Sequence, residues 1–354
     1  MILGLNNLIE EAIKNEVMPG ANYCLIANNE KHFGSFGNKA LYPNIEKNNI
    51  DTIYDMASLS KVVSTTTAIM ILLEQGKLRL SDSVSNILPR FKHKNITVWD
   101  LLTHTSGLQP DIRGTLYADI RREASKFKEV LIDHIYSLEL DTPKNTKIIY
   151  SDMGFILLGF IIEEISKKSL DEFCYEHILK PLEMVDSGYN PKDVNRCAPT
   201  EDRGKYIDRG YVHDEKAHTL EGVAGHAGLF STVKDVSNFM EMILNDGLFK
   251  GKRILSKKSI DLLFTPQVEE TNGIATIKSK RSLGWIVKGD YPVSGDLASE
   301  ATIMHTGFTG THMFIDRVNK VAFCMLTNRV HPTRDNTKII AFRGRLGNYI
   351  MSNL

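Results

Sequence analysis

The chain has 354 residues, enough to bury a large hydrophobic core within one large domain or two smaller ones. Its 43 Lys and Arg residues balance 43 Asp and Glu residues, so no global charge attracts a nucleic acid or an anionic membrane. The expected partner is a small neutral molecule, and the composition indicates nothing about the oligomeric state.

The sequence predicts neither export nor a bound cofactor. Residues 1–16 carry three glutamates and lack the basic start and apolar core of a signal peptide. No segment is apolar over the length that spans a bilayer. The four cysteines are widely spaced and form no metal-binding or redox pattern. We therefore expect a cytoplasmic protein with reduced thiols, no membrane anchor, no metal and no cofactor.

Hydrophobic periodicity predicts the elements in chain order. A helix is expected over residues 5–17, followed by strands over 21–27 and 31–36 and by a long apolar helix from about 57 to 76. Helical patterns recur over 124–138, 152–166, 170–179 and 233–245. Near the C-terminus the β-prone runs 302–307, 311–315 and 321–327 fit an antiparallel meander, and a last helix is expected over 335–351.

This order places sheet-forming segments at both chain ends and helices between them. Because strands must pair, the terminal segments are expected to form one antiparallel sheet with flanking helices. We therefore predict an α+β fold and a single catalytic unit over 1–354. Residues 1–56 and 285–354 would form a sheet-containing α/β lobe, and residues 57–284 a mostly helical lobe. The seam between the lobes is the expected place for an active site.

Ser58 and Lys61 lie three residues apart at the start of the apolar helix, and therefore on one face. A serine hydroxyl is a poor nucleophile until a base takes its proton, and a desolvated lysine can do so. The helix N-terminus adds N–H groups where an oxyanion would form. In the alternative, purely structural interpretation, Ser58 caps the helix and Lys61 lies at the protein surface.

The Ser-x-x-Lys spacing occurs twice more, at Ser125 and Ser231. Ser125 lies in a strongly charged stretch that is typical of a solvated helix face. Ser231 follows a glycine-rich run and is expected near a helix cap. Only the Ser58 copy opens an unbroken apolar helix, so we favour it as the reactive one.

Two further motifs have structural explanations when they are taken alone. Tyr150-Ser151-Asp152 opens another apolar helix, where Asp152 fits a first-turn carboxylate and Tyr150 fits a core aromatic residue. The segment 305–307, His-Thr-Gly, ends a strand, where glycine supplies unusual backbone angles or lets the backbone approach a bound acyl group closely.

Together, Ser-x-x-Lys, Tyr-Ser-Asp and His-Thr-Gly make a specific set. With the flanking segments 96–108 and 222–232, the set resembles the serine β-lactamase and penicillin-binding-protein superfamily, and its class C branch most closely. The resemblance covers nearly the whole chain and implies a β-lactamase/transpeptidase-like fold. It implies Ser58 as nucleophile, Lys61 as its base partner and Tyr150 as the residue that returns the proton to the leaving group.

The resemblance also implies the remaining site residues. The backbone N–H groups of Ser58 and Phe308 would form the oxyanion hole. Substrate contacts would come from Asp152, His305, Thr306 and Gly307. Asp152 replaces the usual Asn of the family, and an ionised carboxylate can only accept hydrogen bonds. His305 stands where the β-lactamases have Lys, and a histidine with an ordinary pKa near ~6.5 is mostly neutral at pH 7.

The resemblance therefore implies a serine hydrolase that cleaves a small ester, amide or β-lactam through an acyl-Ser58 intermediate, with an esterase as the leading hypothesis. A D-amino-acid peptidase, a DD-carboxypeptidase and a class C β-lactamase are alternatives, although the missing export signal argues against substrates outside the cytoplasm. Because of Asp152 and His305, uncharged esters should be preferred to penicillins, unless Asp152 binds the free amine of a D-aminoacyl substrate.

Two further hypotheses come from other functional classes. A penicillin-binding sensor would be acylated at Ser58 and turn over slowly. A metal-dependent hydrolase would use His213, Asp214, His218 and His226, which cluster within fourteen residues. Their spacing does not fit His-Glu-x-x-His on a helix, and glycines interrupt the segment. We therefore favour the serine hydrolase.

Overall fold

In the part of the chain that the structure describes, nine strands form an antiparallel sheet at the centre of the protein. The structure is a computed structural model that describes residues 1–123, 126–204, 206–271, 278–288 and 293–354. Within these residues the strand order is β3-β2-β1-β14-β13-β12-β11-β10-β9. The strands are β1 (Gly20–Ala27), β2 (Glu30–Ala40), β3 (Glu46–Lys47), β9 (Val268–Thr271), β10 (Lys278–Arg281), β11 (Ile286–Val287), β12 (Thr302–Thr306), β13 (His312–Asp316) and β14 (Val321–Thr327).

The strand β14 lies inside the sheet and is buried on both faces. All seven of its residues are buried. Ala322, Cys324 and Leu326 belong to the core shared with the helical lobe, whereas the alternate residues Phe323 and Met325 belong to a second core. Side chains alternate across a strand, so a strand covered on both faces has a continuous apolar sequence.

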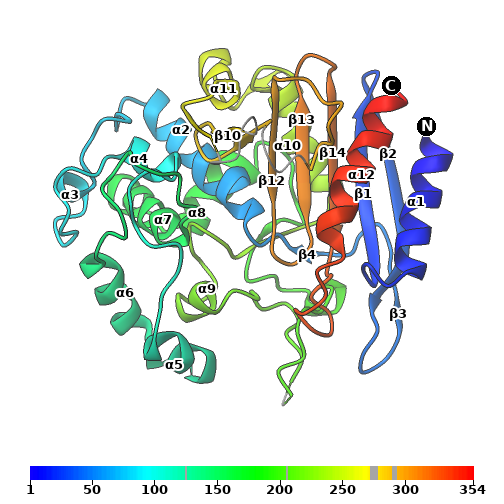
Figure 1. The fold of residues 1–354 in the computed structure, drawn as a ribbon, viewed down its shortest axis with the longest axis horizontal. Coiled ribbons are helices and arrows are strands. Elements are labelled where there is room, and N and C mark those ends of the chain that lie inside the picture. The colour runs from blue at the N-terminus through cyan, green and yellow to red at the C-terminus, as the bar shows by residue number, and fades with distance from the viewer. Residues whose placement is uncertain (124–125, 205, 272–277, 289–292) are drawn as a thin grey trace.

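Pairing of β1 with β14 joins the two ends of the chain, as predicted, with Cys24 directly opposite Cys324. The helices α1 (Ile2–Lys14) and α12 (Ile339–Ser352) supply the second core and cover one face of the sheet, while α10 (Val233–Leu244) covers the other (Figure 1). The predicted α+β fold is confirmed, and the predicted strand at 321–327 is confirmed to the residue.

The remaining helices gather beside the sheet and form the helical lobe (Figure 1). They are a π-helical segment η1 (Lys61–Thr66) that continues into α2 (Thr67–Glu74), then α3 (Val84–Ile87), α4 (Val98–Leu102), α5 (Thr115–Glu123), α6 (Lys128–Ser137), α7 (Asp152–Ser166), α8 (Leu170–Cys174), η3 (Tyr175–Leu179), η4 (Val194–Arg196), α9 (Glu215–Thr219) and α11 (Lys257–Phe264). Two small sheets accompany them, β4-β6-β5 (Tyr54–Asp55, Leu229–Ser231 and Gly188–Tyr189) and β7-β8 (Leu248–Phe249 and Lys252–Arg253).

Several boundaries differ from the sequence-based expectation. The first helix covers Ile2–Lys14 rather than 5–17, and the apolar helix expected from about 57 is assigned from Lys61, so that Ser58 lies in the turn before it. The sheet also takes in β10 and the edge strand β9, and both precede the predicted lobe boundary at residue 285. These strands are rich in charged residues and lack the apolar signal of a buried strand. The helix expected over 124–138 is α6, preceded by α5, and residues 124–125 lie outside the described part of the chain. The last helix begins at Ile339 rather than near 335.

None of the described helices combines the length and the hydrophobicity that crossing a bilayer requires.

Truncation of Phe323 should test the two-sided core of β14. Its ring is fully buried, with ring centroids 5.9 Å from Tyr23 and 5.7 Å from Phe314. Phe323→Ala should lower the free energy of unfolding by about 3–5 kcal/mol, because it removes a large apolar group and leaves a cavity. Val318→Ala, at a side chain that is 69% exposed, should change it by less than about 0.5 kcal/mol. Urea denaturation measures both; similar losses would contradict the proposed burial.

Candidate active site

A strained turn presents Ser58 at the junction of the sheet and the helical lobe. Ala57 has a φ of 47°, in the left-handed region that few non-glycine residues adopt. The buried carboxylate of Asp55 accepts the Ala57 N–H at 2.8 Å and, through its other oxygen, the His213 N–H at 2.7 Å. Asp55 thereby fixes the turn before Ser58 and ties it to the segment that leads into α9.

Lys61 lies directly beneath Ser58 and is completely buried. Its Nζ donates to Ser58 Oγ at 2.9 Å and to the His226 carbonyl at 2.9 Å, and lies 2.7 Å from Asp152 Oδ1. Burial opposes the charge of the ammonium, but Asp152 and Tyr150 outweigh burial and raise the pKa of Lys61 above its usual value. The resting site therefore holds Lys61 as a cation that donates to the serine hydroxyl.

The second motif reaches Lys61 through the N-terminus of α7. Ser151 caps this helix, because its Oγ accepts the Gly154 N–H at 3.2 Å. The preceding Tyr150 ring has its centroid 5.0 Å from Lys61 Nζ. The ring centroids of His104 and His305 lie 4.7 and 6.0 Å from that of Tyr150. Burial and neighbouring cations lower the pKa of both histidines well below the usual value, so two neutral rings flank the tyrosine.

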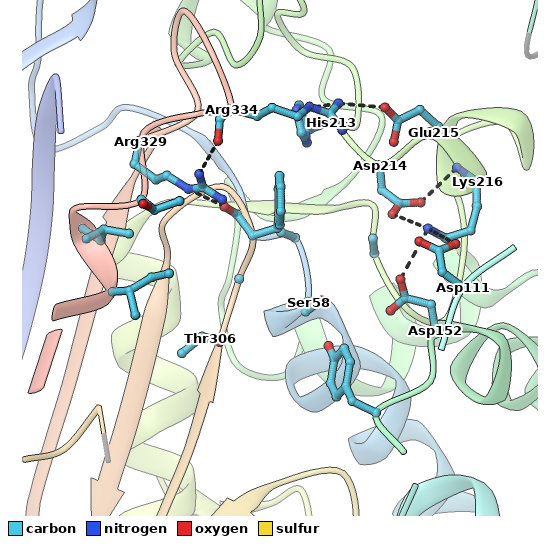
Figure 2. A pocket seen from close by; sticks show the side chains of 18 of the residues that line it. Ser58, Asp111, Asp152, His213, Asp214, Glu215, Lys216, Thr306, Arg329 and Arg334 are labelled. Atoms are coloured by element: carbon cyan, nitrogen blue, oxygen red, sulfur yellow. Dashed lines mark hydrogen bonds and ion pairs between the residues drawn. The ribbon is translucent and has the colours of Figure 1, made fainter. Parts of the chain in front are cut away.

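Asp152 lies between two buried ammonium groups. Lys61 faces one of its oxygens, and Lys216 Nζ lies 3.4 Å from the other. Lys216 also lies 3.0 Å from Asp111 Oδ1 and 3.0 Å from Asp214 Oδ2. Burial opposes ionisation of Asp152, but the two lysines outweigh it and hold the pKa of this carboxyl at about 2. Figure 2 shows this cluster on one side of Ser58, with Arg329 and Arg334 on the other.

The third motif approaches the Ser58 turn from the end of β12. Thr311 and Thr309 donate their hydroxyl groups to the carbonyls of residues 56 and 55, at 3.1 and 2.9 Å. A Cβ atom at Gly307 would lie 2.7 Å from the Met56 carbonyl oxygen and 2.1 Å from Thr311 Oγ1. Glycine is therefore required for the hairpin to reach the turn.

Two arginines fix the backbone around Gly307. Arg343, on α12, donates from Nη2 to the carbonyls of Gly307 and Thr311 at 3.1 and 2.9 Å. Arg329 donates from Nε to the Phe308 carbonyl at 2.9 Å, and its guanidinium carbon lies 4.5 Å from the centroid of the Phe308 ring. In a trans peptide the C=O and N–H point in opposite directions. The contact to the Gly307 carbonyl therefore sets the direction of the Phe308 N–H.

These elements enclose a cavity of about 490 Å³. Of the predicted site residues, six line it: Ser58, Tyr150, Asp152, Thr306, Gly307 and Phe308. Lys61 lies below the floor, in contact with Ser58. His305 is 2% exposed and does not line the cavity; successive strand side chains point to opposite faces, so Thr306 faces the cavity and His305 packs behind it, against Tyr150.

The four residues of the metal hypothesis are not assembled into one site. His226 Nε2 lies 2.7 Å from Asp214 Oδ1, but His213 pairs with Glu201 at 3.1 Å and His218 lines a different cavity. One ligand atom each of Asp152, Asp214 and His226 lies within 4.8 Å of the others. The ammonium of Lys216, however, already contacts both carboxylates. These residues therefore fit an internal cation better than a bound metal.

Several residues of the cavity wall had no signal in the sequence. They are Asp111, Lys216, Arg329, Arg334 and Arg343. Of the two other Ser-x-x-Lys copies, Ser231 is buried and its hydroxyl bonds that of Ser187 at 2.7 Å, whereas Ser125 lies outside the described residues.

The fold and the site together define a serine hydrolase of the penicillin-binding-protein type. The family model described as Beta-lactamase matches residues 5–346. A protein of Escherichia coli (strain K12), provisionally named D-alanyl-D-alanine carboxypeptidase, is 32% identical, over 90% of this chain and 81% of its own length. The N-acetylmuramyl-L-alanine amidase of Bacillus subtilis (strain 168) is 32% identical, over 79% of this chain and 68% of its own length. The chain therefore belongs to the beta-lactamase family.

Solved structures show the same fold at lower identity. An octameric penicillin-binding protein homologue from Pyrococcus abyssi aligns with a TM-score of 0.73 and 22% identity, over 98% of this chain and 77% of its own. A hydrolase with promiscuous acyltransferase activity aligns with a TM-score of 0.77 and 19% identity, over 97% of both chains. The predicted β-lactamase/transpeptidase-like fold is confirmed.

Substitution of Asp55 should test how the Ser58 turn is held. An amide at this position offers one oxygen and an NH₂ group to two N–H donors, so Asp55→Asn leaves one buried N–H without an acceptor. We expect a loss of about 1–3 kcal/mol in the free energy of unfolding. The same change at Asp51, an exposed partner of Lys234, should cost less than about 1 kcal/mol. Equal losses in the two variants, measured by thermal or urea denaturation, would disprove this role.

Proposed function

We propose that the protein hydrolyses small, uncharged esters or amides through an acyl-Ser58 intermediate, as a member of the class C branch of its family. The observation that carries this proposal is the 2.9 Å contact between Lys61 Nζ and Ser58 Oγ at the cavity wall. A serine beside a buried amine, at a site open to a small molecule, has the geometry of an activated nucleophile.

The proposed reaction proceeds by acylation and then hydrolysis. As Ser58 Oγ attacks the substrate carbonyl, its proton passes to a unit formed by Tyr150 and Lys61, and Tyr150 returns it to the leaving group. Because Lys61 holds its own proton in the resting site, this unit must lose one proton before it can accept another. Activity should therefore rise with pH. Water then attacks the carbonyl carbon of the acyl-Ser58 ester, the bond from that carbon to Ser58 Oγ breaks, and the acid leaves with the water oxygen while a proton from the water returns to Ser58 Oγ.

The oxyanion would be bound by the backbone N–H groups of Ser58 and Phe308. In the described part of the chain, neither N–H donates a hydrogen bond within the protein. Both residues line the cavity, and Arg343 and Arg329 fix the peptide groups on either side of Phe308. The donors are thus supported and available before the substrate binds.

The pairing of charges in the cavity wall favours an uncharged substrate. Arg334 contacts Glu201 and Glu215, while Arg343 donates to two carbonyls. Both oxygens of Asp152 face lysines, which weakens the alternative in which Asp152 binds a substrate amine. The amide alternative draws its support from the relatives named as a carboxypeptidase and an amidase.

Covalent labelling should identify the nucleophile. A fluorophosphonate should add once to the wild-type protein, and intact-mass spectrometry should show no adduct in Ser58→Ala, because the labelled oxygen is removed. Ser231→Ala, which removes the serine of another Ser-x-x-Lys copy, should still be labelled. An adduct that persists in Ser58→Ala would refute the assignment.

A panel of substrates should decide which type of bond the protein cleaves and whether it prefers an uncharged substrate. We expect kcat/KM to be highest for p-nitrophenyl butyrate, lower for D-alanine p-nitrophenyl ester and lowest for nitrocefin, because Arg334 and Asp152 in the wall already face opposite charges. A higher kcat/KM for the D-alanine ester would favour recognition of the substrate amine. A kcat/KM for nitrocefin above those of both esters would contradict the proposal. A stoichiometric burst without further turnover of any substrate would identify a slow penicillin-binding sensor instead.

A further inference from the structure

Lys216 is a buried lysine that the proposed reaction does not use directly. Its side chain is 2% exposed, and its Nζ faces three carboxylates at 3.0, 3.0 and 3.4 Å. An ammonium group has three N–H donors. Asp111, Asp214 and Asp152 together match that number, so Lys216 has no donor left for a substrate.

The position of Lys216 is fixed by the N-terminus of α9. Asp214 caps this helix through Oδ1, which accepts the backbone N–H groups of Lys216 and Ala217 at 3.0 and 2.9 Å. The same carboxylate holds the Lys216 ammonium and the His226 ring. Backbone and side chain of Lys216 are therefore held by one residue, so its ammonium points at Asp152 before any substrate is present (Figure 2).

Lys216 matters because it compensates the negative charge of Asp152. Where the motif of the class C branch that the sequence resembles usually has an uncharged Asn, this chain places a carboxylate 2.7 Å from Lys61. An uncompensated carboxylate would bind the Lys61 ammonium strongly and compete with Ser58 Oγ for it. Lys216 takes the second oxygen of Asp152, and this divides the attraction between two cations.

We propose that Lys216 is a positioning residue for the Ser58–Lys61 pair: it neutralises Asp152, so that the carboxylate takes the place of the usual Asn without withdrawing Lys61 from the serine. This inference rests on the proposed acyl-Ser58 chemistry. It makes residues 152 and 216 a functional pair in which the charge of one requires the charge of the other.

The titratable and charged groups around Lys61 and Asp152 determine how the pH profile responds to each substitution. The groups that face Lys61 are Ser58, Tyr150, Asp152, His104 and His305. The groups that face Asp152 are Lys61, Lys216, Asp111, Asp214 and His226. Only residues 152 and 216 are changed in the test, and the repulsion of Asp152 by Asp111 and Asp214 is part of the coupling that the cycle measures.

A double-mutant cycle with p-nitrophenyl butyrate tests the pair. Lys216→Met should lower kcat at least about tenfold and move the rising limb of the pH profile to higher pH, because Asp152 then stabilises the Lys61 cation alone. Asp152→Asn should move that limb to lower pH. In the Asp152→Asn background, Lys216→Met should change kcat less than about threefold.

The cycle separates catalytic positioning from structural support. Repulsion between Asp111 and Asp214, left by loss of the lysine, is common to both backgrounds and cancels. If Lys216→Met does not fold, Lys216→Gln completes the same cycle with two N–H donors retained. Lys144→Met, which removes the partner of the buried Asp100 at 3.2 Å, should lower stability but leave the pH profile in place.

Equal kcat losses in the two backgrounds, or an unmoved pH limb in Lys216→Met, would overturn the inference. Labelling distinguishes this failure from failure of the proposed function. If Ser58→Ala abolishes the covalent adduct while the cycle is additive, only the role of Lys216 is wrong. If the adduct survives in Ser58→Ala, the proposed function itself is wrong.

Discussion

The buried ammonium of Lys61 is the interaction on which the site depends. A cation removed from water must be met by acceptors on several sides. Its three acceptors come from separate segments: the Ser58 turn, the first turn of α7 and the loop that carries His226. Satisfying one cation therefore fixes the nucleophile, the Tyr150 segment and the approach to β6 relative to one another.

The sheet contributes the opposite wall under a steric constraint. Gly307 allows the end of β12 to approach the Met56 carbonyl, and Thr311, in the turn that leads into β13, donates its hydroxyl to that carbonyl. Arg343 comes from α12, a helix that covers the sheet, and reaches the Gly307 carbonyl. The helix that covers the sheet thus also orients the peptide that faces Ser58.

Local patterns in the sequence predicted the features that depend on neighbouring residues. Ser58 and Lys61 meet because their spacing matches a helical turn, and β14 is recognisable because both of its faces are buried. Because β12 is buried on both faces, its sequence does not show which side chains face the cavity. The sequence therefore could not tell that Thr306 lines the cavity and that His305 does not.

Features that depend on distant segments left no such pattern. Asp111, Asp152 and Lys216 are remote in sequence, and only the tertiary fold brings their charges together. Asp214 and His226 were noticed, but their chemistry fits a metal ligand as well as an ion pair. Which of the two applies depends on the lysine between the carboxylates. The charged strands β9 and β10 were missed because they bury no apolar face.

The pairing of β1 with β14 has a consequence for synthesis on the ribosome. The hairpin of β1 and β2 emerges early, but the strand that closes its open edge is made almost last. At about 5–20 residues per second, the intervening chain takes on the order of tens of seconds to appear. During that time β1 offers unpaired N–H and C=O groups to any other strand. A chain that stops before Val321 would therefore carry Ser58 and Lys61 but leave this edge of β1 uncovered, and we expect it to be bound by chaperones or degraded rather than to act as a partly active enzyme.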